Sequence, residues 1–202
     1  MKKNILTIVA VLCLSTFTSL SQTENVFYRN AIGLTASMIS GSGLAYRYSF
    51  NERFAWKVAG FIFYNETTSN QDHRNGMYTT YDDNFLIYNL GTEFQLTFYR
   101  SEDVRLFGLV GINYIYDLDE YRYPTPDVNF SDYDQIERTV GTGIGVGIEV
   151  SLTDQLMFNV DGGYMYRYYR EELNYQSNFR QSGITESRGT RFGAGIGISY
   201  AF

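Results

Sequence analysis

The chain has 202 residues, a formal net charge of −6 and 17% aromatic residues, with Tyr 19, Phe 15 and Gly 19 against Pro 2. An acidic chain is a poor candidate for nucleic-acid binding, because phosphate contacts need clustered Lys and Arg. Aromatic residues suit pleated strands and glycine suits tight turns and bulges, so the composition predicts an all-β protein.

Residues 1–21 have the organisation of a secretory signal peptide. Lys2 and Lys3 form a basic start, 5–14 form an apolar core, and 19–21 supply small residues for cleavage. The apolar stretch is too short for a membrane-spanning helix, which needs about 20 apolar residues. We therefore expect a mature domain of 22–202, with a formal net charge of −8 once the two lysines are removed.

Cys13 is the only cysteine and lies in this signal segment. Leu12 precedes it where lipoprotein signals resemble one another in having a small residue, so we do not expect lipidation. The mature chain then has no thiol for a disulfide, a metal site or a nucleophile. We expect neither a metal nor a cofactor.

Eight segments alternate between apolar and small or polar residues, as strands of a small membrane barrel do over about 10 residues each. In chain order the segments are 32–38, 44–50, 54–64, 86–98, 106–116, 139–152, 156–168 and 191–202. The even positions carry the apolar face in every segment, most clearly from Phe192 to Phe202. We predict an eight-stranded antiparallel up-and-down transmembrane β-barrel.

Short and long connections alternate between these segments. Short polar turns are expected at 51–53, 100–103 and 153–155, and long connections at 65–83, 117–138 and 170–189, while 39–43 is tight. Outer-membrane barrels have short periplasmic turns and longer external loops. Both termini are therefore expected in the periplasm, with three long loops outside.

The uncharged even face is expected to meet lipid. Soluble eight-stranded barrels have an apolar interior and a wetted exterior, whereas here the odd face carries the charges and the glycines. Aromatic residues gather at the segment ends, as in the girdles at the two membrane interfaces. The girdle positions are assigned to Trp56, Phe98, Tyr166, Tyr200 and Phe202.

Over 27–202 the chain resembles the OmpA-type and OmpX-type eight-stranded outer-membrane barrels. The most specific piece is Ile196-Gly197-Ile198-Ser199-Tyr200-Ala201-Phe202, which is similar to the terminal aromatic strand that the barrel assembly machinery recognises. The resemblance implies an outer-membrane protein that contacts lipid and this machinery, and we expect a monomer. Such proteins act as adhesins, structural anchors, narrow channels or lipid A modifying enzymes, so the fold does not choose among these roles. No peptidoglycan-binding domain follows the last strand, so a tether role is not expected.

The inward charges are the first group of candidate site residues. Because odd positions are expected to point inward, these charges are Arg47, Lys57, Glu93, Arg105, Glu149, Asp161, Arg167 and Arg191. Charges in a narrow interior must be paired or hydrated. We expect a structural network that plugs the lumen, with an ion gate as the alternative.

Two apparent catalytic signals are weak. The glycine columns 141–147 and 193–197 do not complete G-x-G-x-x-G, since Ile148 and Ile198 replace the third glycine. Small inward residues are better explained by tight curvature and by the room they leave for opposing side chains. The lone His73 has no nearby His-x-Ser arrangement, because Asn75 occupies that place. We expect no catalytic residue and no enzyme activity.

The connection at 117–138 is acidic and rich in tyrosine, but it lacks the spacing of a calcium loop. Tyr121, Tyr123 and Tyr133 are candidate anchors for an extracellular partner. The sequence therefore favours a structural or adhesin-like surface role, with a narrow ion or solute channel as the alternative.

Overall fold

The computed structural model describes residues 28–73, 77–122, 132–175 and 182–202, and the proposed signal segment and Tyr123 lie outside this part. The described residues form eight antiparallel strands: β1 Asn30–Ser37, β2 Gly41–Ser49, β3 Phe54–His73, β4 Met77–Arg100, β5 Val104–Arg122, β6 Tyr133–Ser151, β7 Leu156–Tyr175 and β8 Gly183–Ala201. Each strand pairs with its neighbours in the chain, and β1 pairs with β8 to close the ring. The predicted eight-stranded up-and-down barrel is confirmed. No helix in the described ranges is long and apolar enough to span a membrane.

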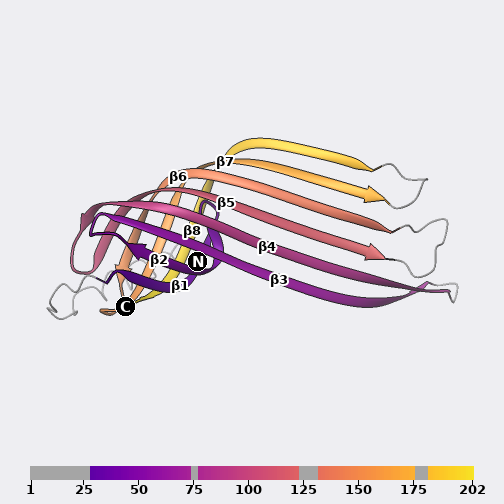
Figure 1. The fold of residues 1–202 in the computed structure, drawn as a ribbon, viewed down its shortest axis with the longest axis horizontal. Helices are drawn as coiled ribbons and strands as arrows, with labels where there is room; N and C mark the ends of the chain where they lie inside the picture. Colours follow the sequence, from indigo (N-terminus) through magenta and orange to yellow (C-terminus); the bar gives the residue numbers. More distant parts are fainter. Residues whose placement is uncertain (1–27, 74–76, 123–131, 176–181) are drawn as a thin grey trace, which may run out of the picture.

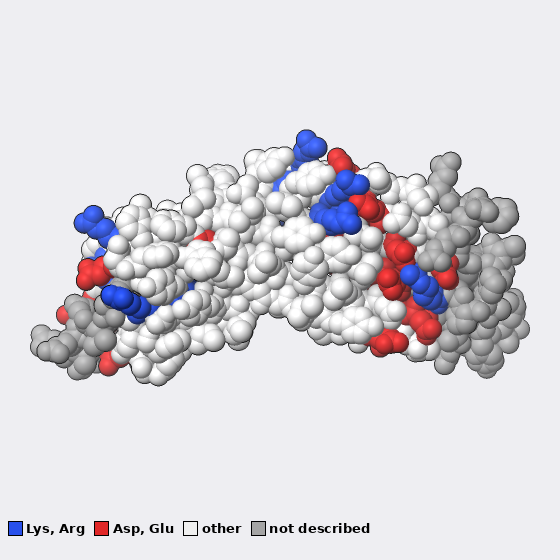
Figure 2. All heavy atoms as spheres, in the orientation of Figure 1, with Lys and Arg blue, Asp and Glu red and all other residues white. Residues whose placement is uncertain are grey.

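The two faces of the barrel strands differ as the alternation predicts. Odd positions point inward, where Ala31, Thr35 and Ser37 of β1 are buried, while Ile32 and Leu34 are exposed outside. A barrel that exposes its apolar side chains and buries its charges is built for a lipid surround rather than for water. Figure 2 shows the same contrast on one face, because charged atoms are scarce over the barrel and gather at its turn end and on the far part of the sheet.

Strand length divides the molecule into two parts. β1 and β2 are short, whereas β3 to β8 continue well beyond them as one curved sheet (Figure 1). The β1–β8 ladder ends at the pair Ser37 and Gly195, and the β2–β3 ladder ends at Leu44 and Gly60. Beyond these pairs the ring is open. We call the part of β3 to β8 beyond them the protruding sheet.

The structure corrects the expectation of three long loops. Most of 65–83, 117–138 and 170–189 is strand, and only 74–76, 123–131 and 176–181 lie between the described hairpin arms. The sequence signal failed because both faces of these extensions are polar or mixed, so the apolar alternation stops although the strand pairing continues. His73 likewise ends β3 instead of lying in a loop.

The tight first connection folds into the mouth of the barrel. Gly41 has a φ of 90° and Gly43 a φ of 121°, a left-handed region that glycine enters at little cost. The Asn113 amide donates to the Met38 carbonyl (2.7 Å) and the Ser42 amide donates to the Asn89 side chain (2.9 Å). Ile39 and Ser40 are completely buried as a result. We call residues 38–40 the cap.

Candidate functional site

The half of the lumen nearer the short turns holds a connected charge network. Glu149 of β6 accepts from Arg47 of β2 and lies 3.3 Å from the Nε of Arg105 of β5. All three side chains are nearly buried. The Arg105 guanidinium also donates to Gln95 of β4 and covers the Phe107 ring at 4.7 Å. Two arginines therefore share one carboxylate at this level.

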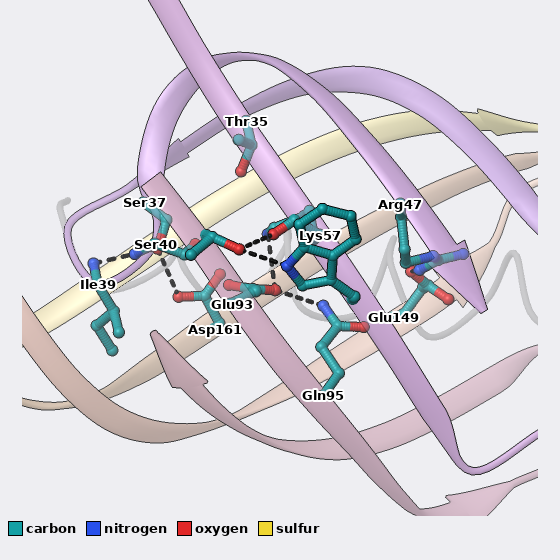
Figure 3. A network of polar contacts seen from close by, with 12 residues as sticks. Thr35, Ser37, Ile39, Ser40, Arg47, Lys57, Glu93, Gln95, Glu149 and Asp161 are labelled. Atoms are coloured by element: carbon teal, nitrogen blue, oxygen red, sulfur yellow. Dashed lines mark hydrogen bonds and ion pairs between the residues drawn. The ribbon is translucent and has the colours of Figure 1, made fainter. Parts of the chain in front are cut away.

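A second level of the network lies nearer the cap. The Lys57 ammonium is 2.9 Å from a Glu93 oxygen, and Gln95 donates to the same carboxylate. On the opposite wall the Ser37 hydroxyl donates to Asp161 (3.2 Å). Figure 3 shows Arg47 and Glu149 at one side of the view, Lys57, Glu93 and Gln95 in the middle, and Ser37, Asp161, Ile39 and Ser40 at the other side.

Most charges of the network are paired. Arg47 and Arg105 share Glu149, and Lys57 pairs with Glu93, while Asp161 has the Ser37 hydroxyl as its hydrogen-bond donor. The six groups come from different strands around the ring. Buried charges persist only when they are paired and hydrogen-bonded. Five of the six inward charges are thus ion-paired across the lumen side of the strands.

An apolar layer lies in the lumen beside the cap. Ile39 of the cap packs with Phe107, Leu109 and Met165, all of them buried. A methyl group added at Gly111, Gly143 or Gly193 would lie only 3.1 to 3.3 Å from the Ile39 side chain, so these glycines make room for the cap. Among the charges a cavity of about 20 Å³ is lined in part by Arg47, Lys57 and Glu149, room for about one water molecule.

The sequence reasoning missed the linking role of Gln95 and the position of Arg100, which is exposed but close enough for its charge to act on Glu149. Gln95 was placed inward by parity, but nothing marked it as a link between Glu93 and Arg105. Arg100 was assigned to a turn, yet a register shift between Thr97 and Tyr99 pairs it with inward Arg105. Such a bulge inserts one extra residue and reverses the face of those that follow. Alternation alone could not reveal it.

Arg167 and Arg191 stand apart from the network and are a second correction. Both belong to the inward face, but they lie above the apolar layer, where no opposing wall of described residues covers them, and Arg191 is exposed. Arg167 donates to Thr139 (3.0 Å) and packs against the Tyr169 ring (5.6 Å). Parity gave their face correctly, but it could not show that the ring is open at this height.

The girdle candidates all point outward from the barrel. Trp56, Phe98, Tyr166, Tyr200 and Phe202 expose 42 to 62% of their surface. Trp56 donates to Thr92 (2.6 Å) and Tyr200 donates to Gln155 (2.6 Å). An exposed ring with a satisfied polar tip suits the interface between lipid and water.

The inner face of the protruding sheet carries a ladder of tyrosines. Tyr121 and Tyr133 are directly opposite each other in β5 and β6 and stack at 4.6 Å between ring centroids. Tyr175 of β7 continues the ladder at 5.7 Å from Tyr133. Two of the three proposed anchors therefore lie side by side on strands.

Carboxylates occupy the adjoining rows of the same face. Asp117 is paired with Glu137, which is paired with Glu171, and Asp119 lies one row further out. Burial raises the pKa of Asp119 to about 6, with Asp117, Asp83 and Glu137 adding to the effect. Burial also raises the pKa of Asp117, again aided by Glu137. No group of His, Cys, Asp and Glu among the described residues is arranged to hold a metal ion.

On the outer face charges are paired both across strands and along β7. Glu172 lies 2.6 Å from Arg138 and 2.8 Å from Arg170, and Asp134 lies 2.6 Å from Arg122. These pairs are partly exposed, so each contributes little to stability.

Comparison with known proteins gives structural likeness only. No family model matches the sequence, and no curated protein is significantly similar to it. A major outer membrane protein from Thermus thermophilus matches 86% of this chain and 98% of its own, with 12% identity and a TM-score of 0.49. CarO of Acinetobacter baumannii matches 89% and 100%, with 10% identity and a TM-score of 0.36. Ail, the attachment invasion locus protein of Yersinia pestis, matches 86% and 94% in its complex with the heparin analogue sucrose octasulfate, with 14% identity and a TM-score of 0.38. Identities and TM-scores this low carry no information on function.

Proposed function

We propose that this chain is an outer-membrane surface-interaction protein whose barrel is a plugged anchor and whose protruding sheet contacts an extracellular partner. The observation that carries the proposal is the length of β3 to β8 beyond the closed ring. A barrel that only crossed the membrane would need strands of about 9 to 11 residues. β4, with 24 residues, is more than twice that length.

The orientation follows from the two ends of the barrel. At one end three tight turns close on themselves, with bonds such as Phe50 N to Phe54 O (2.9 Å) and Leu152 N to Leu156 O (2.7 Å). The protruding sheet is at the other end (Figure 1). Because the short turns of such barrels face the periplasm, we place the sheet outside the cell and both termini in the periplasm.

The protruding sheet has two free edges that suit an extended polypeptide partner. Beyond Gly60 the β3 edge has no strand beside it, and neither has the β8 edge from Gly183 to Gly193, among the described residues. An unpaired edge presents a row of N–H and C=O groups that can accept an added strand. The β8 edge is exposed throughout 183–190.

The filled lumen argues against the channel alternative. Water or ions would have to cross the layer of Ile39, Phe107, Leu109 and Met165, all buried and apolar, and then the paired charges beneath it. Conductance of the refolded barrel in planar bilayers would test this directly. Steady single-channel currents would contradict the plug.

The interaction itself is tested by trimming the sheet. Cells that display the full chain should adhere to cultured epithelial monolayers or to immobilised matrix proteins. A variant with all three hairpins shortened to the level of the closed ring should lose this adhesion. A variant with Pro at Ile184 and Glu186 tests the β8 edge alone, since proline removes N–H donors from an edge. Even positions of β8 direct their backbone groups to the β1 side, as Ala194 and Phe202 do. Equal adhesion by the full and trimmed chains would contradict the proposal.

A further inference from the structure

An open pocket lies on the inner face of β7 and β8, directly beyond the apolar layer. Its volume is about 380 Å³, and its lining includes Arg167, Tyr169, Ser187, Thr190 and Arg191. A pocket of this size is within the range of small-ligand sites. Its floor is the β7–β8 ladder, in which Arg167 is opposite Gly189 and Arg191 is opposite Met165. The two arginines are therefore diagonal neighbours on one face.

The pocket has an unbalanced positive charge. Neither Arg167 nor Arg191 lies within salt-bridge distance of a carboxylate of the described residues, and the two guanidiniums are near enough to repel each other. The Nε of Arg167 is buried without a hydrogen-bond partner in this part of the chain. Arg188 also borders the pocket, but its guanidinium lies over the Tyr168 ring (5.3 Å) and 3.7 Å from Glu186.

The nearest acidic residues are held away from these two cations. The Tyr169 hydroxyl donates to Glu171 (3.2 Å), and Gln135 donates to both Glu137 and Glu171 (3.1 Å each). Through these bonds the carboxylates of Glu137 and Glu171 face Gln135 and Tyr169. The Tyr169 ring, packed on the Arg167 guanidinium, forms the boundary between the acidic rows and the pocket.

We propose that this pocket binds an oxyanion, a phosphate or sulfate group carried by a water-soluble ligand. Guanidinium groups bind such oxygens through paired N–H donors, and the Ser187 hydroxyl, on the same inner face, supplies a further donor beside them. The pocket opens on the inner face, away from the surface that meets lipid, which favours a soluble ligand over a lipid headgroup. The inference deepens the proposed function, and it rests on that proposal only for the side of the membrane on which the ligand is found.

Inorganic pyrophosphate is the probe for this site, with the refolded mature chain in nanodiscs of zwitterionic lipid. Titration should show saturable binding by calorimetry and shifts of the Arg167 and Arg191 Nε–Hε NMR signals. Arg191→Gln should weaken binding about tenfold, since one charge-assisted contact is worth about 1.5 kcal/mol. The double variant R167Q/R191Q should abolish it.

Arg170→Gln is the matched control. Like a change at Arg167, it removes one positive charge from β7, but on the outer face, where Arg170 is paired with Glu172. Its affinity for pyrophosphate should stay within about twofold of the parent, because partly exposed pairs contribute little. A folded R167Q/R191Q barrel that binds as well as the parent, or a parent that shows no saturable binding, would overturn the proposal.

Two further measurements distinguish a soluble ligand from a lipid headgroup and test which side of the membrane the pocket faces. If nanodiscs containing phosphatidylglycerol block pyrophosphate binding, the same chemistry belongs to a lipid headgroup and the soluble-ligand assignment is wrong. Binding by the purified barrel, together with an Arg191→Cys thiol that a membrane-impermeant reagent cannot label on sealed cells, would uphold the pocket and contradict the outward orientation.

Discussion

Replacing Glu149 with alanine should destabilise the barrel more than any single change at its periplasmic turns. The carboxylate is shared by Arg47 and Arg105 and is nearly buried. Its loss leaves both guanidiniums, with Arg100 close by, in a narrow space that offers room for about one water molecule. Removing one partner of a buried ion pair costs about 3 to 5 kcal/mol.

The assay is equilibrium unfolding in urea of the refolded barrel. With a urea dependence of about 1 to 3 kcal/mol per molar, the midpoint should fall by at least about 1 M. Glu102→Ala, an exposed change in the turn before β5, is the matched control and should shift the free energy by less than about 0.5 kcal/mol. Adding Arg47→Met to Glu149→Ala should recover part of the loss. Equal midpoints for Glu149→Ala and Glu102→Ala would refute the pairing and favour a hydrated, conducting lumen.

Three other outcomes are expected. Ile144→Arg, on the outward face near the middle of β6, should cost about 2 to 4 kcal/mol, whereas Tyr200→Arg in the girdle should cost at most about 1 kcal/mol; a flat profile in urea would contradict the membrane assignment. Gly91→Ala should lower the unfolding free energy by about 1 to 3 kcal/mol and expose the cap to hydrogen exchange, because the new methyl would lie 2.1 Å from the Ser40 carbonyl oxygen. The pKa of Asp119 is raised from 3.8 to about 6, so the folded sheet binds this proton more tightly than the unfolded chain, and its stability should rise as the pH falls from about 6 towards 4. Amide exchange in β5, corrected for intrinsic rates, should slow over that window in the parent and not in Asp119→Asn.

The sequence predicted the barrel well wherever one face of a strand meets lipid. There the contrast between faces is strong, and the even positions from Phe192 to Phe202 alternate without a break. The same rule failed where that contrast is lost. In the protruding sheet Glu137 and Arg138 or Glu171 and Glu172 put polar residues on both faces, so strands looked like loops.

The remaining errors concern long-range geometry. Nothing local in Met38-Ile39-Ser40 shows that this turn enters the lumen, because its contacts come from Asn113, Gly143 and Ala194, far along the chain. The face of Arg100 depends on a bulge that periodicity cannot locate. The assignment of Arg191 to the lumen assumed a wall on every side, and the short β1 and β2 remove that wall.

The shortness of β1 also gives the ring a weak seam where the two ends of the chain meet. Its ladder with β8 joins only Ala31–Ser37 to Gly195–Ala201, whereas β3 and β4 are paired along the whole of Phe54–His73. Fewer hydrogen bonds must break to part the β1–β8 seam than to part any junction between the long strands. Pulling on the two ends of the chain should therefore open the barrel at this seam first, as a low-force step that precedes the unzipping of the long hairpins. In assembly the same seam is the natural last junction to form, after β3 to β8 have zipped into a single curved sheet.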